Sequence, residues 1–541
     1  MEYILKPSTI FSRYDKLDSD RQNFRHTWQD IADYVHPTRN DINNSYSSGE
    51  KRRTHLLDNT GIVNKELLAA NLHSMLTNPN TNWLQFTTGN RDLDREVVVN
   101  RWLERQSEVT IEILNASNFQ TEIFSFYEDL AGLCTAGLWI DEDDEMIVRF
   151  LTLHINSFVI RENHKGFVDE AYRKFKWTAR NIVGEFGEEK ALVIPMIKEA
   201  FEKNSEQEFE IIHAVYPNMD PKRQESKFDF ISQYAIKDHV SNNEPFEIDR
   251  SGYYEKPCIV SRWKKLAGEM YGRGPGWTAL PEMKILNEMT KTTIKGAQKT
   301  VDPPVQMTDD GVVLPLKLIP GGVNFRRPGS DPITPIFDNY RVDFGIQAMD
   351  GHRMRIKEAF YTDRLTLPDR DRMTAEEVNT HQENNGRLLG PLMGRQEVEF
   401  LTPTIDRVYG IIERKGLYER PPSEVVEYFK KQKKSFVELK TRYKSFLSRS
   451  QKASELNKYS RAFEFINAMA QLRPSVLDNI DEDALLLDVL GLQEISPRVI
   501  RSPEERDEMR EAAAEQAQKQ QQQADELQQA EVANKVAPLV K

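Results

Sequence analysis

The chain has 541 residues, 39% of them hydrophobic and 29% charged, which is enough for roughly three or four domains with buried cores. Its two cysteines, Cys134 and Cys258, exclude a disulfide framework and a structural zinc site, and no apolar run reaches the roughly 18 residues that span a bilayer. Lys plus Arg total 73 against 85 Asp plus Glu, and the resulting net charge of −12 argues against a protein that coats nucleic acid by bulk attraction.

Signatures of common enzyme classes are missing from the sequence. It has no P-loop, no H-E-x-x-H, no G-x-S-x-G and no kinase signature set. The acidic run 141–145 could ligate a divalent cation, but it lies between two short apolar stretches, which favours a solvated hairpin turn. The GRGPG run at 272–276 lacks the third spaced glycine of a dinucleotide fingerprint, so a tight turn is favoured there. These absences argue against an ATPase motor, a metalloprotease, a serine hydrolase and a kinase, and they leave a chain without recognised catalytic residues.

The first 277 residues are predicted to be α+β. From Phe11 to Val35 the apolar residues recur at steps of three and four, which predicts one buried face of a long helix that ends before Pro37. Short strands are predicted from about residue 139 to 172 and around EFEIIHAVYPN.

Two helices are predicted to enclose a segment rich in proline and glycine. Apolar spacing predicts a helix at 278–300, and the Pro-Pro pair that follows stops it. Residues 301–340 suit short strands and turns, and a second helix is predicted at 341–360. The simplest geometry is an antiparallel helix pair that carries a compact β subdomain at its far end. On the first helix Lys284, Lys291, Lys295 and Lys299 lie at steps of seven, four and four, close to one helical face.

A polar loop at 361–373 precedes a further long helix. Thr374 and Glu377 form a capping box, which predicts a helix that reaches Glu413 and ends at Gly416. Pro391 lies inside this pattern, so we expect a kink near it.

A basic segment and a glutamine-rich tail complete the chain. Residues 414–461 hold 14 Lys/Arg and 5 Asp/Glu, a net +9 inside an acidic protein, with KKQKK at 430–434 as the densest part. A solvated face is favoured there, and direct phosphate contact stays open as an alternative. Pro503 opens a final helix, and beyond about Gln516 its large apolar residues vanish, so a frayed helix or a flexible tail is expected.

Several motifs, taken together, resemble those of the portal (head-to-tail connecting) proteins of short-tailed, podovirus-type bacteriophages. They occur in order from about Phe11 to Gln520 and include WQDIADYVHPTR, LLDNTGIVNKELLAANLHSMLTNPNTNWLQF, GFVDEAYRKFKWTARNIVGEFG, KPCIVSRWKKLAGEMYGRGPGWTALPEMKILNEM, VDPPVQMTDDGVVLPLKLIPGG and MTAEEVNTHQENNGRLLGPL. Each motif alone would be weak, but their colinearity covers nearly the whole chain. The lysine density at 430–434 and the long glutamine tail are particular to this sequence.

The resemblance implies a predominantly helical α+β subunit of a dodecameric ring at one capsid vertex. A separate terminase large subunit would thread double-stranded DNA through the ring, so catalysis would belong to that partner and this protein would be no enzyme and would carry no metal or cofactor. Tail or adaptor proteins would dock on the ring later, and major capsid and scaffolding proteins would contact it, with no membrane involved. The protein would be in the host cytoplasm during assembly and then in the virion. The implied regions are wing/body 1–277, stem helices 278–300 and 341–360, clip 301–340, tunnel loop 361–373, kinked helix and wing 374–451, helical crown 452–515 and tail 516–541.

The resemblance also selects candidate DNA-facing residues. A uniformly basic channel would hold DNA rather than let it slide, and a mostly acidic conduit would avoid that adhesion. In the tunnel loop the candidates are Arg364, Arg370 and Arg372, offset by Asp363, Asp369 and Asp371. On the stem they are the four lysines at 284, 291, 295 and 299, for which outward solvation or pairing between subunits is equally open. A possible basic contact patch consists of Lys430, Lys431, Lys433 and Lys434.

Two alternatives come from other classes. The first is a metal-dependent DNA-processing enzyme in which the DEDDE run at 141–145 supplies metal-binding carboxylates. The second is a monomeric scaffold that binds DNA through residues 414–461. Neither alternative accounts for the colinear motifs.

Overall fold

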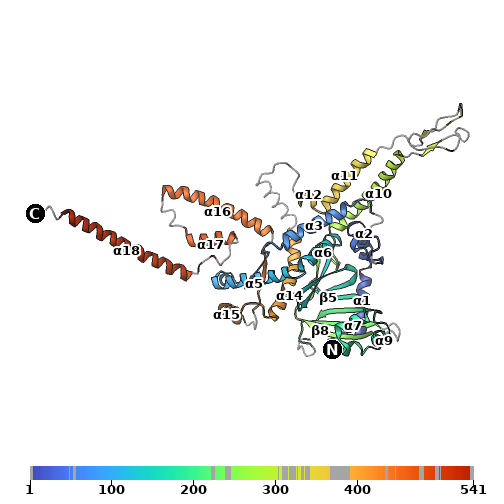
Figure 1. Ribbon diagram of the computed structural model, residues 1–541, viewed down its shortest axis with the longest axis horizontal. Helices are drawn as coiled ribbons and strands as arrows, with labels where there is room; N and C mark the ends of the chain where they lie inside the picture. The colour runs from blue at the N-terminus through green and yellow to red at the C-terminus, as the bar shows by residue number, and fades with distance from the viewer. Residues whose placement is uncertain are drawn as a thin grey trace. The chain divides into compact units, whose positions relative to one another are not determined.

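The computed structural model describes residues 4–47, 49–52, 56–220, 226–237, 245–301, 304–306, 315, 325, 327–329, 334–335, 342–365, 390–432, 437–444, 446–473, 480–493, 499, 501 and 503–536. The chain forms two compact units, and each is built from separate stretches of sequence. Unit 1 comprises residues 1–81 and 112–416, and unit 2 comprises residues 82–111 and 417–541. Helices predominate and several sheets are present, in agreement with the predicted α+β class (Figure 1).

The predicted N-terminal helix of unit 1 is interrupted. α1 (Pro7–Asp20) and α2 (Gln22–Val35) meet at Arg21, whose side chain is buried. The guanidinium group of Arg21 donates hydrogen bonds at 2.7 to 3.0 Å to the carbonyl oxygens of Ile155, Asn156 and Phe158. The prediction of one long helix is therefore wrong, because apolar spacing does not reveal a cation that binds a cluster of buried carbonyl groups.

Two antiparallel sheets form the β part of unit 1. A three-stranded sheet has the order β3-β2-β9, and a five-stranded sheet has the order β4-β5-β6-β7-β8. The strands are β2 (Thr135–Asp143), β3 (Ile147–Leu153), β4 (Phe158–Glu162), β5 (Val168–Thr178), β6 (Glu208–Pro217), β7 (Phe230–Lys237), β8 (Pro245–Tyr253) and β9 (Cys258–Arg262).

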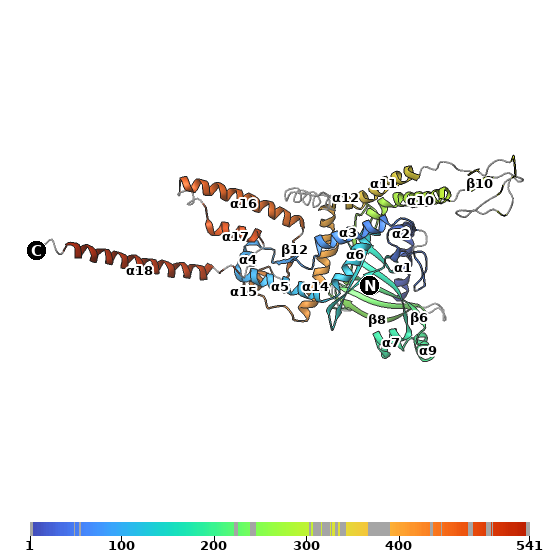
Figure 2. The same cartoon turned by 45° about the horizontal axis from the view of Figure 1, so that its top comes forward.

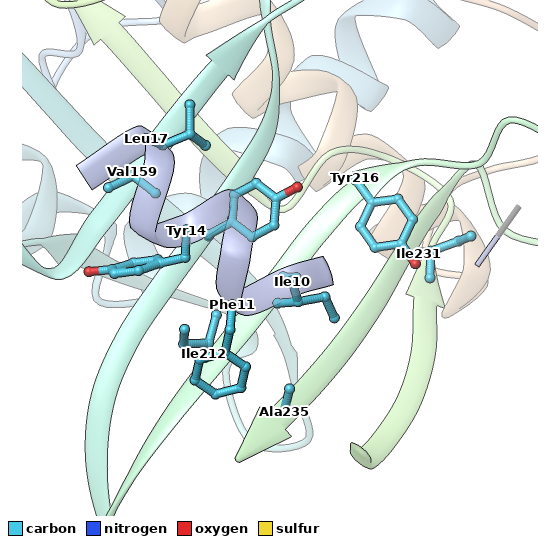
Figure 3. Packing of buried hydrophobic residues seen from close by; sticks show 11 residues of the cluster. Ile10, Phe11, Tyr14, Leu17, Val159, Ile212, Tyr216, Ile231 and Ala235 are labelled. Atoms are coloured by element: carbon cyan, nitrogen blue, oxygen red, sulfur yellow. The ribbon is translucent and has the colours of Figure 1, made fainter. Parts of the chain in front are cut away.

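Helices cover both faces of the five-stranded sheet. On one face Phe11 and Tyr14 of α1 pack with Ile212 of β6 and its neighbours (Figure 3). On the other face Ile211 packs with residues of three short helices, α7 (Ala179–Phe186), α8 (Glu188–Ala191) and α9 (Pro195–Lys203). Successive residues of a strand point to opposite faces, so β6 contributes to both cores.

Two long helices leave the body of unit 1 as an antiparallel pair. α10 (Pro275–Val301) and α11 (Val342–Ala359) lie side by side and correspond to the helices predicted at 278–300 and 341–360 (Figures 1 and 2). Between them β10 (Val305–Gln306) pairs with β11 (Thr334–Pro335), and most of the remaining predicted β subdomain lies outside the described residues. α3 (Thr60–Leu76) and α6 (Phe119–Gly132) pack beneath the pair.

The predicted long helix after the polar loop is described from residue 390. A π-helical turn, Glu397–Leu401, leads into α14 (Thr402–Arg414). The capping box at 374–377 lies outside the described residues. Gly416 follows the helix with a φ of +69°, which glycine adopts without a steric penalty, and this agrees with the predicted end of the helix.

Unit 2 combines segments that are far apart in the sequence. β1 (Leu84–Thr87) pairs with β12 (Lys440–Tyr443), and the other elements are α4 (Arg91–Arg95), α5 (Val97–Ala116, which continues into unit 1), α15 (Ser423–Lys431), α16 (Phe446–Leu472), α17 (Glu482–Leu492) and α18 (Pro503–Val536). α18 continues through the glutamine-rich segment, so a helix rather than a coil forms there. None of the described helices is long and apolar enough to cross a membrane.

Candidate nucleic-acid interface

The α10–α11 pair positions the predicted stem lysines. Leu286 of α10 and Met349 and Ile356 of α11 are buried. Gly345 allows the two helices to approach closely, since a Cβ atom at that position would lie 3.0 Å from the Thr293 hydroxyl oxygen. Thr290 donates its hydroxyl proton to the Leu286 carbonyl oxygen, so this polar group is satisfied within the helix. The packing fixes which face of α10 remains outward.

Polar contacts hold the base of the pair to the body. The Arg353 guanidinium group donates to an Asp58 carboxylate oxygen at 2.8 Å, and the Asn287 side-chain oxygen accepts from the Leu57 amide at 2.8 Å. Burial alone would raise the pKa of Asp58, but hydrogen bonds from Thr60 and Arg353 outweigh it and lower that pKa below its ordinary value. A stable anionic Asp58 therefore joins α11 to the chain that precedes α3.

The glycines of the GRGPG run allow close backbone packing at the start of α10. A Cβ atom at Gly276 would lie 2.0 Å from the Gly132 carbonyl oxygen, and one at Gly272 would lie 2.2 Å from the Cys134 carbonyl oxygen. Neither glycine has a positive φ, and Arg273 forms a β-bridge with Lys264 instead of a turn. The tight-turn prediction is therefore wrong: these glycines are required by contact, which the local sequence does not reveal.

A buried polar network lies next to Gly132, against which the start of α10 packs, and sequence reasoning missed it. His36 Nε2 lies 3.0 Å from an Asp129 carboxylate oxygen, Arg39 donates to that oxygen at 3.2 Å, and the Lys65 ammonium group lies 2.8 Å from Glu128. Burial lowers the pKa of His36, although the Asp129 hydrogen bond acts in the opposite direction. Burial would raise the pKa of Asp129, but Arg39 and His36 outweigh it and lower that pKa. The local sequence around these charged residues gave no signal of the network, because each of them lies within an ordinary amphipathic pattern.

The four stem lysines share one face of α10, but most of them have partners. At about 100° per residue, positions 284, 291, 295 and 299 fall within an arc of roughly 80°. This arc lies opposite the buried side of the helix. The Lys284 ammonium group pairs with Asp30 at 2.7 Å, and that of Lys291 pairs with Glu288 at 3.2 Å. Lys299 also has an interaction.

Only the beginning of the predicted tunnel loop is described. Asp363 and Arg364 lie in the short helix α12 (Thr362–Leu365), where the two side chains pair at 3.5 Å. The buried Thr362 hydroxyl group donates to the Asn64 side-chain oxygen of α3, and this contact anchors the start of the loop. The other four loop candidates, Asp369, Arg370, Asp371 and Arg372, lie outside the described residues.

The possible basic patch is half described. Lys430 and Lys431 are exposed at the end of α15, whose Val425 and Phe429 are buried on the opposite side. This arrangement matches a solvated helix face. Lys433 and Lys434 lie outside the described residues.

The acidic run stabilises local structure. One Asp143 carboxylate oxygen accepts from the amides of Glu145 and Met146 at 2.8 Å each and closes the β2–β3 turn, as predicted. Those amides lower the pKa of Asp143. Glu142 accepts from Arg414 at 2.8 Å. In the part of the chain that the structure describes, no group of three potential metal ligands occurs.

Comparison with known proteins identifies the family. The model of the bacteriophage head to tail connecting protein family matches residues 8–500. The chain belongs to this family. This connecting protein is 27% identical to a probable portal protein of Bordetella phage BPP-1 over 497 residues, which are 89% of this chain and 87% of the relative. It is 26% identical to the portal protein of Salmonella phage epsilon15 over 520 residues, 94% of this chain and 91% of the relative.

Solved structures give a weaker likeness. The neck of an empty gene transfer agent particle aligns with a TM-score of 0.31 and 10% identity, over 62% of this chain and 74% of that one. A chain of the native gene transfer agent virion aligns with the same TM-score and identity, over 69% of this chain and 92% of that one.

Proposed function

We propose that this protein is a phage portal subunit that forms a ring at one capsid vertex, conducts double-stranded DNA during packaging and ejection, and provides a docking platform for terminase and tail proteins. The observation that carries the proposal is the family match over residues 8–500, together with two portal relatives that each align with about nine-tenths of the chain. The family is structural, so we assign the chemistry of packaging to a partner. The capsid, scaffolding and terminase contacts belong to this proposal, as does the place in the virion after assembly in the host cytoplasm.

We assign regions by matching the observed elements to the expected parts. α10 and α11 would form the stem, because they are an antiparallel pair joined by the predicted clip segment at 301–340. Residues 361–373 would form the tunnel loop, because they directly follow α11. Residues 1–277 and 374–451 would form the wing and body, 452–515 the crown and 516–541 the tail. Copies of the chain would number about twelve.

The charge arrangement on α10 supports passage of DNA rather than tight binding. Each neutralised phosphate releases counterions, so unopposed lysines would hold the polymer. Lys284 and Lys291 are paired with Asp30 and Glu288. An α10 face with two of its four lysines already offset presents a reduced net charge to a passing duplex.

The enzyme and monomeric-scaffold alternatives are weaker. The DEDDE carboxylates are used in a turn and in ion pairs with Arg414 and its neighbours. Lys430 and Lys431 lie on a solvated helix face. No observation in the described residues favours either alternative over the portal assignment.

Electron microscopy of the purified protein, with native mass measurement on the same sample, tests the proposal. We expect closed rings with an axial hole and a mass near that of twelve subunits. A chain that stays monomeric at high concentration, even after scaffolding protein is added, would contradict it. Neutralising Arg364, Arg370 and Arg372 should then impair DNA packaging without preventing ring formation; loss of rings would contradict a sliding contact.

A further inference from the structure

Unit 2 contains a pocket with three arginines around it. The pocket has a volume of about 420 Å³ and lies between the β1–β12 strand pair, α4 and the first turns of α5 (β12, α4 and α5 are labelled in Figure 2). Arg91 and Arg95 lie one turn apart on α4, and Arg442 lies on β12 directly opposite Gln85 of β1. We call these residues and their cavity the arginine pocket. Sequence analysis selected neither Arg91 nor Arg95, and it selected Arg442 only as part of the basic segment 414–461.

Asp94, the acid that lines the arginine pocket, offsets only one of its three positive charges. Asp94 accepts hydrogen bonds from the Thr88 amide at 2.9 Å and the Thr88 hydroxyl group at 2.7 Å, and from the Thr87 hydroxyl group. These contacts hold the turn between β1 and α4. Among the residues that the structure describes, none of the three pocket arginines has a carboxylate partner. Three guanidinium groups around one cavity repel one another, and a bound anion would relieve that repulsion.

The surroundings favour a polymeric anion. β12 lies inside the 414–461 segment, whose net charge is +9. Lys440 and Arg442 are two residues apart on β12, so they share a face of the strand pair about 6.8 Å apart along it. Their partners on β1, Thr87 and Gln85, both line the pocket. A row of cations that continues past a pocket suits a polymer with closely spaced phosphates better than a single carboxylate.

We propose that the arginine pocket binds a backbone phosphate of double-stranded DNA. Guanidinium groups match the geometry of phosphate oxygens and remain charged at every physiological pH. The choice of DNA as the source of the phosphate rests on the portal function proposed above, whereas the anion site itself does not. The contact would hold DNA at a surface of unit 2 separate from the α10 lysines.

Chemical protection tests the site directly. The assembled full-length protein is treated with phenylglyoxal, and modification of each arginine is followed by peptide mass spectrometry, without ligand and with a short duplex, inorganic phosphate or polyglutamate. We expect the duplex to slow modification of Arg91, Arg95 and Arg442 by about tenfold, because charge-assisted hydrogen bonds occupy the guanidinium groups. Modification of the exposed Arg420 should not change. Equal reactivity of the pocket arginines with and without every anion would overturn the site. Protection by polyglutamate but not by duplex would overturn DNA as the ligand and assign an acidic protein segment instead.

Matched variants separate the pocket from general charge. The test variant carries Arg91→Gln, Arg95→Gln and Arg442→Gln, and the control carries Arg420→Gln, Arg461→Gln and Arg473→Gln, which removes the same charge from exposed positions of unit 2. We expect about tenfold weaker duplex binding by the test variant than by the control. Equal weakening of both would overturn the pocket. Electron microscopy of the same samples separates the two proposals. If the wild-type protein forms rings and the test variant binds duplex as tightly as the control variant, only the pocket proposal is contradicted. If the wild-type protein forms no rings, the portal function is contradicted.

Discussion

The cations of α10 and those of the arginine pocket differ in what surrounds them. On α10, Lys284 and Lys291 have carboxylate partners within the same chain. In the pocket Arg442 and its two neighbours have none among the described residues, and the nearby Asp94 accepts hydrogen bonds from two threonines instead. The difference teaches that the number of basic residues on a surface is a poor guide to its net charge when carboxylates lie beside them. On the proposals made above, the local supply of carboxylates would separate a surface over which DNA slides from one that binds it.

The largest effect is expected from a substitution that disrupts the packing of α10, the helix that carries the lysine surface. Gly276→Ala places a Cβ atom 2.0 Å from the Gly132 carbonyl oxygen, and the backbone at the start of α10 must move. We expect a loss of about 3 kcal/mol in the free energy of unfolding, measured with urea. Hydrogen exchange should increase in α10 and not in the β1–β12 pair.

Gly351→Ala is the matched control for this substitution. Gly351 lies in α11 with open space around it, so the added methyl group meets no atom. Alanine should raise the free energy of unfolding by about 0.5 to 1 kcal/mol, since it restricts the unfolded chain and favours helix. Equal destabilisation by the two substitutions would contradict the close-approach explanation.

A smaller effect comes from the ion pair at the base of α11. Asp58→Asn should cost about 1 kcal/mol at pH 7, discounted for the partial exposure of Arg353. The folded-state pKa of Asp58 is lowered from 3.8, so its stabilisation is present above 3.8 and disappears as the pH falls through the lower folded value. Urea unfolding of wild type and variant should therefore converge in acid. Asp350→Asn, which removes the exposed partner of Arg353, should change little; a cost as large as that of Asp58→Asn would contradict this account.

Salt dependence compares the two surfaces directly. Arg442→Gln should reduce the slope of log K for duplex binding against log salt by about 1, because one phosphate contact is lost. Lys284→Gln should leave the slope nearly unchanged, since Asp30 already neutralises that lysine. Binding isotherms across a salt series measure both. Similar slopes for the two variants would show that the α10 lysines and the arginine pocket contribute equally to phosphate binding.

The smallest effect is expected from a substitution that removes one carboxylate partner from the α10 lysines and so makes that surface more like the arginine pocket. Glu288→Gln removes the partner of the exposed Lys291, and helix stability should change by less than about 0.5 kcal/mol. Duplex binding by assembled protein at low salt should become slightly tighter. Adding Lys291→Gln should cancel the gain, and a gain that persists in the double variant would assign it to another charge.

Local sequence signals predicted individual helices and turns, whereas contacts between distant segments became visible only in the structure. Apolar spacing and the proline stop located α10, and the turn residues around Asp143 located the β2–β3 hairpin. The break at Arg21 was not predictable, because the carbonyl groups that it binds lie more than a hundred residues away. The same holds for the arginine pocket, where Arg442 meets α4 only because β12 pairs with β1. Of the candidate DNA-facing residues, sequence gave the shared face of the α10 lysines but not their partners.

The β1–β12 pair also sets an order for synthesis. Strand β1 ends at Thr87 and its partner begins at Lys440, so at about 5 to 20 residues per second the ribosome needs on the order of 20 to 70 s to supply the second strand. Throughout that interval β1 has an unpaired edge on this side. A chain that terminates before Lys440 lacks the partner strand of β1 and leaves that edge exposed. Truncated products would thus differ from complete subunits by an open strand edge that can pair with other chains.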